Sequence, residues 1–244
     1  MNPSDEKIHI VACHYKLPEK RLRDFISWNT ELFVKFNVTL HVVSDVPRDN
    51  LPEWVKIHIY PRELKVYSPA RVSNFGIRQA GGGIVCKTDI DCVFSEEALK
   101  EISVVFPGMG VYFTYLMVKS YEERGKFQRW GSTCGTMALN FSDWEKLCGY
   151  DERLEGYGIE DGDGVARARL FCKVPKSIAS VYHVSHGNTE LWSQTNVCLR
   201  RDLWNRKGGF CPDRHVINRK IRDTQGRWNN PDWGKGIDLG PTLG

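Results

Sequence analysis

Several patterns are missing from this chain of 244 residues. No apolar run approaches the ~20 residues that a membrane-spanning helix needs, so we expect no transmembrane segment. The N-terminal residues Met1–Lys7 lack the charged-then-apolar pattern of a secretory signal. Internal repeats and low-complexity tracts are also missing. With 41% hydrophobic residues, the sequence predicts one globular domain with a sizeable core.

The cysteines form no C-x-x-C pair, which is the usual mark of a structural zinc site or a redox motif. The chain contains eight of them: Cys13, Cys86, Cys92, Cys134, Cys148, Cys172, Cys198 and Cys211. Many lie inside apolar segments. We therefore expect reduced, mostly buried thiols in a cytoplasmic protein.

The positive charge is concentrated near the C-terminus. Residues 200–235 contain ten Lys or Arg and four Asp or Glu, whereas the whole chain has a net charge of +4. Trp204, Trp228 and Trp233 lie among these basic residues. This basic C-terminal segment, residues 196–244, has three open interpretations: a solvated region packed over the core by its tryptophans, a clamp on a pyrophosphate, or a patch for a polyanion such as nucleic acid.

Strand-like and helix-like patterns alternate over the first half of the chain. This order predicts an α/β protein with a mainly parallel sheet flanked by helices, with ligands at the carboxyl ends of the strands. We expect strands at 8–13, 38–45, 54–60 and 83–86, and helices at 22–36 and 71–80. Asp45 and Asp89 then lie at the ligand-binding edge, although Asp45 is equally suited to cap a turn.

A D-x-D pattern, Asp89-Ile90-Asp91, follows the last of these strands. If the chain stays extended there, both carboxylates point to one side and Ile90 returns to the core. Two carboxylates at the end of a strand can hold a hard divalent cation such as Mg²⁺ or Mn²⁺. A capped turn is the alternative interpretation.

Acidic residues crowd a glycine-rich turn at 156–164, where Glu160, Asp161 and Asp163 precede a helical pattern. The helix dipole favours acids at this position. A carboxylate in such a turn can also accept a proton from an attacking hydroxyl. Further on, His183 and His186 lie in a strand-like run at 181–186. They would face opposite sides of a strand, so we expect only one of them to reach a metal ion.

In this order, the motifs resemble the GT-A fold glycosyltransferases. The sequence is most similar to the C-terminal half of the galactosyltransferase type and to bacterial family 2 enzymes. The resemblance extends over residues 8–186, with the highest similarity at 135–169, and includes G-Y-D-E-R, Y-G-I-E-D-G-D and V-Y-H. It implies a GT-A domain at residues 1–195, with the 196–244 segment packing on the active site or closing over it.

The resemblance also implies roles for individual residues. Asp89 and Asp91 would bind Mn²⁺ or Mg²⁺, with His183 or His186 as a further ligand. Asp161 would be the base of an inverting transfer. The remaining candidates bind substrate: Glu160 and Asp163 near the base, Trp130 and Gly131 at the acceptor, and Asp45, Arg71, Asn74 and Arg78 at the nucleotide or phosphates. For the three residues at 71–78, a polar helix face is an equal alternative, and Asp163 is also placed to brace the loop.

The implied activity is the transfer of a sugar from a nucleotide-diphosphate donor, with a UDP-sugar favoured, to an acceptor hydroxyl. Glycans, glycolipids and hydroxylated bases in DNA remain open as acceptors, and the basic C-terminal segment supports the last of these. We expect a bacterial protein, or a viral or phage protein, in the cytoplasm. The sequence departs from the galactosyltransferase type at Tyr157-Gly158-Ile159, where that family has a glycine-tryptophan run, so the donor sugar is not implied.

Two other functions were weighed. A sugar-nucleotide pyrophosphorylase needs a G-x-G-x-R loop after the first strand, but residues 13–18 read C-H-Y-K-L-P. A non-catalytic nucleotide-sugar-binding module would need the pocket, but it would not need Asp89, Asp91 and Asp161 together.

Overall fold

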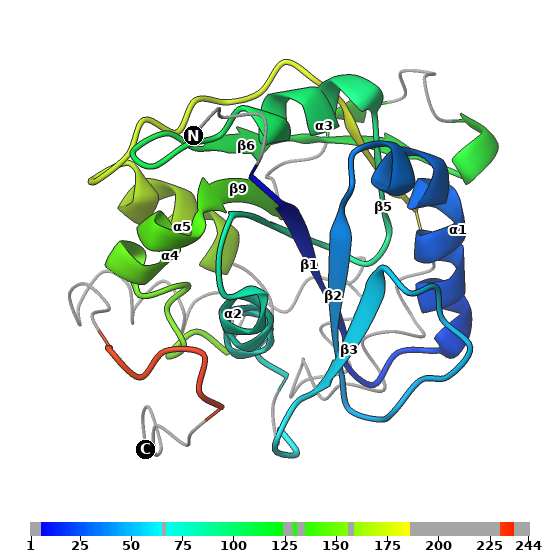
Figure 1. Cartoon of the computed structure of the whole chain (residues 1–244), viewed down its shortest axis with the longest axis horizontal. Coiled ribbons are helices and arrows are strands. Elements are labelled where there is room, and N and C mark those ends of the chain that lie inside the picture. Colours follow the sequence, from blue (N-terminus) through cyan, green and yellow to red (C-terminus); the bar gives the residue numbers. More distant parts are fainter. Residues whose placement is uncertain are drawn as a thin grey trace, which may run out of the picture.

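A six-stranded sheet forms the centre of the molecule (Figure 1). The computed structural model describes residues 6–64, 67–123, 129–130, 135–155, 159–185 and 230–236, with only the backbone described at 129–130. The strands follow the order β3 (Val55–Ile59), β2 (Thr39–Ser44), β1 (Ile8–His14), β4 (Ile84–Thr88), β9 (Thr136–Asn140) and β6 (Val111–Phe113). The predicted strands at 8–13, 38–45, 54–60 and 83–86 are therefore confirmed, with small shifts at their ends.

The first four strands of this sheet are parallel, as predicted. The sheet also contains a reversed strand, because β9 runs antiparallel to both β4 and β6. Every residue of β1, β2 and β4 is buried. Strands covered on both faces are typical of parallel sheets with helices on either side, and their nearly continuous apolar sequences follow from this burial.

Helices cover both faces of the sheet. On one face, α1 (Glu19–Lys35) and α3 (Glu96–Ser103) share a core with Ile10 and Ala12 of β1. On the other face, three helices pack around Val11, and Figure 1 shows them together on one side of the sheet. They are α2 (Pro69–Ala80), α4 (Phe141–Leu147) and α5 (Glu160–Ala168).

Helix α2 lies very close to the sheet. The Ser68 hydroxyl caps its first turn by accepting a hydrogen bond from the backbone N–H of Arg71, and Gly81 ends it in a left-handed conformation. At Gly76, a Cβ atom would collide with Val11 and Val43. The close approach of the helix therefore depends on this glycine.

A second, four-stranded sheet, which the sequence patterns do not indicate, lies beside the first. Its order is β5 (Cys92–Phe94), β10 (Val181–Val184), β7 (Tyr115–Val118) and β8 (Arg129–Trp130), and a 3-10 turn follows β7 at Tyr121–Glu123. The D-x-D segment connects β4 of the first sheet to β5 of the second. The predicted strand at 181–186 ends at Val184.

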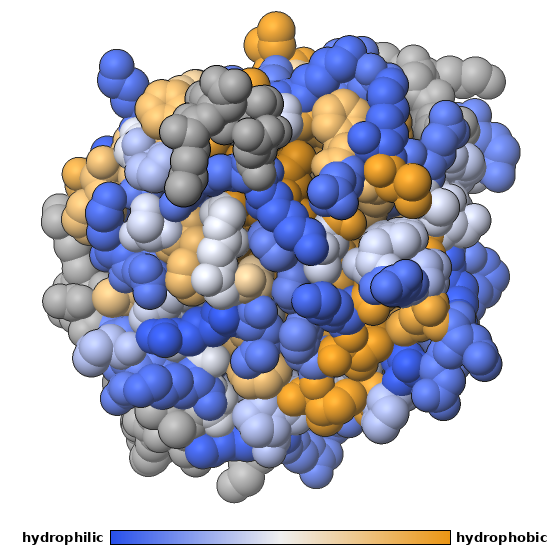
Figure 2. Space-filling model, in the orientation of Figure 1, coloured by the Kyte–Doolittle hydropathy of each residue, from blue (hydrophilic) through white to orange (hydrophobic). Residues whose placement is uncertain are grey.

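Within the described ranges, no helix combines the length and the apolar character needed to cross a bilayer. Figure 2 shows a mostly hydrophilic face with separate hydrophobic areas. The described cysteines, Cys13, Cys86, Cys92, Cys148 and Cys172, are buried free thiols, as predicted.

Candidate active site

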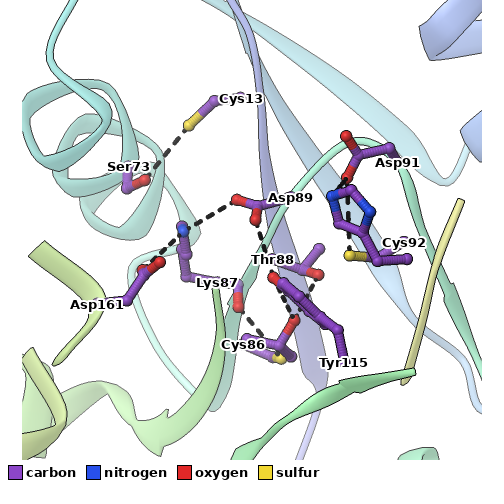
Figure 3. A network of polar contacts seen from close by, with 12 residues as sticks. Cys13, Ser73, Cys86, Lys87, Thr88, Asp89, Asp91, Cys92, Tyr115 and Asp161 are labelled. Atoms are coloured by element: carbon purple, nitrogen blue, oxygen red, sulfur yellow. Dashed lines mark hydrogen bonds and ion pairs between the residues drawn. The ribbon is translucent and has the colours of Figure 1, made fainter. Parts of the chain in front are cut away.

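The D-x-D segment forms a turn between the two sheets. Strand β4 ends at Thr88, so the expectation that Asp89 and Asp91 share one side of an extended strand is wrong, and the turn alternative describes the backbone. Ile90 does return to the core, as predicted, with 5% of its surface exposed. Because the chain turns here, the carboxylates of Asp89 and Asp91 face different partners (Figure 3).

The Asp89 carboxylate is held by groups from both sheets. Its Oδ1 accepts a hydrogen bond from Lys87 Nζ at 3.1 Å, and its Oδ2 accepts one from the Tyr115 hydroxyl at 2.9 Å. Gly135 lies against the same carboxylate, and a Cβ atom there would collide with Asp89 Oδ2 and the Tyr115 hydroxyl. Only a glycine can occupy this position without displacing Asp89.

Lys87 connects the D-x-D turn to α5. Its side chain is 4% exposed, and Nζ lies 3.1 Å from Asp89 Oδ1 and 3.1 Å from Asp161 Oδ1 (Figure 3). Burial lowers the pKa of Lys87, but the charges of Asp161 and Asp89 outweigh this and raise the pKa well above its usual value. Lys87 is therefore a cation at neutral pH and brings together two carboxylates that are far apart in sequence.

The second acid of the motif faces a histidine. Asp91 Oδ1 lies 3.2 Å from His183 Nε2, across the antiparallel pair in which His183 of β10 is opposite Cys92 of β5. Arg21 NH1 lies 3.9 Å from Asp91 Oδ2. His183 therefore lies beside the D-x-D motif, its role as a metal ligand stays a prediction, and His186 lies outside the described residues.

The donor atoms of Asp89, Asp91 and His183 suit a hard divalent cation, which prefers carboxylate oxygens and accepts an imidazole. Asp91 and His183 already face each other, while Asp89 is turned to Lys87. Among the residues that the structure describes, no three His, Cys, Asp or Glu side chains are gathered tightly enough to hold a metal ion. The residue types fit the metal, and Asp89, Asp91 and His183 are the described side chains that would hold it.

The first turn of α5 carries the predicted acids. Glu160 is 7% exposed, and its Oε2 has no hydrogen-bond partner among the described residues. Burial and then the charge of Asp161 raise the pKa of Glu160 to about 8. Burial also raises the pKa of Asp161. The charge of Lys87 opposes this rise, and the charge of Asp89 adds to it. Both neighbouring carboxyl groups thus bind a proton more readily than they would in water.

The backbone immediately before this turn is unusual. Ile159 has a φ of 81°, a conformation that branched side chains rarely adopt. Such outliers are concentrated at functional sites. Asp163, two residues after Asp161 in α5, has another role: its Oδ2 accepts a hydrogen bond from Arg167 Nε at 2.7 Å. Arg167 in turn donates to the backbone oxygens of Leu147 and Gly149, so Asp163 braces α5 against the end of α4.

The three polar residues on α2 contact the protein itself. Asn74 is fully buried and bonds to Tyr150 and Glu152. Arg71 Nε donates to the Glu152 backbone oxygen, and Arg78 Nε donates to the Trp233 backbone oxygen. These contacts match the polar-face alternative given for Arg71, Asn74 and Arg78, and their predicted role at the nucleotide stays a prediction.

A hollow of about 360 Å³ opens at the carboxyl ends of β1, β2 and β3. It is lined by Tyr15, Lys16, Asp45, Tyr60, Pro61, Arg62 and Glu63. The Asp45 carboxylate accepts a hydrogen bond from the Lys16 backbone N–H at 3.0 Å. Asp45 therefore lines a space at the predicted edge of the sheet and also orders a turn.

The two residues predicted at the acceptor are not placed as side chains. Trp130 lies in β8, where only the backbone is described, and Gly131 is outside the described residues.

Lys87, Tyr115 and Gly135 were not identified from the sequence as site residues. Lys87 offered a signal, because a lysine inside a buried apolar run needs a charged partner. Tyr115 and Gly135 offered none, because their contacts with Asp89 depend on how the second sheet meets the first.

Comparison with known proteins places this geometry in context. A family model described as the N-terminal domain of galactosyltransferase matches residues 115–187. No curated protein sequence matches the chain. Several solved structures are similar in fold at low sequence identity. The catalytic domain of Drosophila β1,4-galactosyltransferase 7 in complex with xylobiose is 14% identical, with a TM-score of 0.54 over 83% of this chain and 80% of that chain.

Two microbial enzymes are also similar. Residues 1–349 of TarS from S. aureus, in complex with UDP-GlcNAc, are 17% identical with a TM-score of 0.54 over 74% of this chain and 59% of that one. The mannosyltransferase PcManGT from Pyrobaculum calidifontis, in complex with GDP-Man and Mn²⁺, is 14% identical. Its TM-score is 0.58, and the match covers 95% of this chain and 68% of that chain. The chain therefore has the GT-A glycosyltransferase fold, as the resemblance predicted. The family match, together with these structures, supports a transferase enzyme.

Proposed function

We propose that this protein is a metal-dependent, inverting glycosyltransferase that uses a nucleotide-diphosphate sugar, with a UDP-sugar favoured. The observation that carries the proposal is the shared contact with Lys87, which places Asp161 beside Asp89 of the D-x-D motif. A base and a pair of metal-binding carboxylates at the carboxyl edge of one sheet are what a direct sugar transfer requires. The manganese, UDP-Gal and xylobiose bound by another structure of the Drosophila enzyme are consistent with such a site.

The donor end of the site has two parts. The hollow lined by Tyr15, Asp45 and Tyr60 offers aromatic and acidic groups to a nucleoside at the ends of the parallel strands. Asp89, Asp91 and His183, with His186 as the alternative to His183, are the side chains that would hold Mn²⁺ or Mg²⁺. Such an ion would neutralise the negative charge on the departing diphosphate.

Asp161 acts at the acceptor end. Its carboxylate accepts the proton of the acceptor hydroxyl as that oxygen bonds to the anomeric carbon. The bond from this carbon to the diphosphate oxygen breaks on the opposite side, and the diphosphate leaves with the electron pair. A single displacement of this kind inverts the anomeric centre. Glu160, with its raised pKa, is suited to donate a hydrogen bond to a sugar hydroxyl.

A glycan or glycolipid acceptor is favoured, because the Drosophila structure contains a sugar, xylobiose. The similar structures give no support to a DNA acceptor. The basic C-terminal segment on which that alternative rests lies outside the described residues except for 230–236.

Calorimetry with UDP tests the donor site. We expect UDP to bind the wild type with Mn²⁺ and to lose most of its affinity in EDTA or in the double variant Asp89→Asn/Asp91→Asn, since both remove the ion that would pair with the diphosphate. The matched control is Asp49→Asn, an exposed acid whose change should leave binding unchanged. GDP, CMP and TDP titrations identify the base. Absence of metal-dependent binding to every nucleotide, in a folded protein, would overturn the proposal.

The variant Asp161→Asn separates an enzyme from a binding module. It should bind UDP as the wild type does, but donor hydrolysis and transfer should slow by about 10²–10⁴-fold, because the base is lost. Unchanged turnover would remove Asp161 from the mechanism. An inactive wild type that nevertheless binds UDP would support the non-catalytic alternative.

A further inference from the structure

Lys87 is a buried cation between Asp89 and Asp161, and the proposed mechanism assigns it no role. This inference rests on the proposed function, because it concerns the base and the metal ligands of that site. Lys87 comes from a fully buried strand, and its side chain is 4% exposed. Its ammonium group lies 3.1 Å from an oxygen of Asp89 and 3.1 Å from an oxygen of Asp161, and 5.8 Å from the centre of the Tyr150 ring.

Burying an unpaired ammonium group costs free energy, because the charge loses its contact with water. The carboxylates beside Lys87 offset this cost. The two partners also need the lysine. Asp89 of the D-x-D turn and Asp161 of α5 are like charges that lie close together, and they would repel each other without a cation between them. The ammonium is a compact charge with three donors, which can bind both carboxylates at once.

Asp89 has both of its oxygens engaged in this arrangement. Oδ1 accepts from Lys87, and Oδ2 accepts from the hydroxyl of Tyr115. Asp91, in contrast, faces His183. A divalent cation bound by both acids would share the Asp89 carboxylate with the Lys87 ammonium, and the two positive charges would repel each other at short range. The ammonium and the metal ion compete for the same carboxylate.

We propose that Lys87 is a positioning residue with two effects: it holds Asp161 in place as the base, and it competes with the divalent cation for Asp89. These two effects have opposite consequences when the charge is removed. Loss of the ammonium frees Asp89 for the metal ion and at the same time releases Asp161. The proposal therefore predicts a variant that binds metal more tightly and turns over more slowly.

The test uses Lys87→Met and Lys87→Arg in the full chain. Calorimetry with Mn²⁺ alone should show that Lys87→Met binds the ion at least about tenfold more tightly than the wild type, because one positive charge within a few ångströms is gone. Transfer should fall about 10²-fold, because Asp161 loses its partner. Lys87→Arg retains the charge, so its Mn²⁺ affinity should stay within about threefold of the wild type.

Lys146→Met is the matched control, because it removes a lysine from another ion pair, that with Asp143 at 2.9 Å. It should change neither Mn²⁺ affinity nor turnover. Melting curves verify folding, and Lys87→Gln, which is polar and neutral, replaces the methionine variant if that one does not fold. A merely structural lysine would lower the melting temperature without tightening the metal site.

The outcomes separate this inference from the proposed function. If the wild type binds neither Mn²⁺ nor a nucleotide, the proposed function itself fails. If the wild type binds both, and the neutral variants bind Mn²⁺ with unchanged or weaker affinity, or turn over at the wild-type rate, the role of Lys87 is overturned.

Discussion

At the scale of single residues, Asn74 shows how a polar side chain can be essential to the interior. It is fully buried, and its Nδ2 donates to the Tyr150 backbone oxygen and to Glu152 Oε1, both at 2.9 Å. Its Oδ1 accepts from the Tyr150 backbone N–H at 2.7 Å. Burial raises the pKa of Glu152, and the hydrogen bond from Asn74 opposes this rise. Asn74 thus ties α2 to the loop that leads to α5.

We therefore expect Asn74→Ala to lower the free energy of unfolding by about 2–3 kcal/mol, because it leaves buried partners without hydrogen bonds. Urea denaturation measures this. Gln79→Ala, an exposed change on the same helix, is the control and should cost less than about 0.5 kcal/mol. An unchanged stability combined with weakened UDP binding would instead favour the nucleotide-binding role that the sequence suggested for Asn74.

At the scale of elements, three neighbouring strands are linked by a row of histidines. His9 of β1 hydrogen-bonds through Nδ1 to Nε2 of His41 of β2, and His41 Nδ1 bonds to Nε2 of His58 of β3, both at 2.9 Å. The charges that face this row are the ammonium groups of Lys7 and Lys56. Burial, reinforced by these charges, lowers the pKa of His9 to about 4, and burial and the adjoining histidines lower that of His41 to about 3.

The row predicts a loss of stability in acid. Unfolded histidines take up protons below their ordinary pKa of 6.5, whereas His9 and His41 in the folded protein stay neutral down to about 4. The unfolded state therefore binds more protons between these values, and stability falls as the pH drops from 6.5 towards 4. We expect a loss on the order of 2–4 kcal/mol between pH 7 and pH 5, measured by urea denaturation.

The variant His41→Gln removes the central member of the row and should flatten this pH dependence. His183→Gln, outside the row, should leave it in place. Equal pH dependence in the wild type and His41→Gln would show that other groups control acid stability.

At the scale of the whole molecule, a short segment near the C-terminus closes one side of the fold. Trp233 is 2% exposed, and the Arg78 guanidinium lies 4.7 Å from the centre of its ring. The Gly234 backbone N–H donates to Glu152 Oε1 at 2.7 Å. Residues 230–236 thus pack on α2 and on the loop before α5.

Trp233→Ala should lower the free energy of unfolding by about 3–5 kcal/mol, because it empties a buried site of aromatic size. Thermal and urea denaturation followed by circular dichroism measure this loss. Trp28→Ala provides the comparison, since Trp28 is only partly buried and stacks on Tyr121, and its loss should be smaller. An unchanged stability in Trp233→Ala would mean that residues 230–236 add little to the stability of the rest.

Much of the fold could be predicted from the sequence, because local patterns determine it. The apolar runs of β1, β2 and β4 and the spacing of apolar residues in α1 indicated alternating elements, and the end of β4 placed Asp89 at the edge of the sheet. The partners of that acid could not be predicted. Lys87 and Asp161 are 74 residues apart, and their contact depends on how α5 packs against β4. The reversed strand β9 and the second sheet likewise arise from tertiary pairing, which no local pattern encodes.

The D-x-D turn also connects the two sheets, and the proposed metal ligands come from both sides of this connection. Asp89 follows β4 of the first sheet, whereas Asp91 precedes β5 of the second, and His183 belongs to β10 beside it. A sliding or rotation of one sheet against the other would therefore change the spacing of the three donor atoms without touching any of them. The ion affinity of the proposed cation site would depend on how the two sheets are aligned. Substitutions where the two sheets meet, away from the D-x-D turn, should therefore change the ion affinity. A defect in metal binding need not come from a change in a metal ligand.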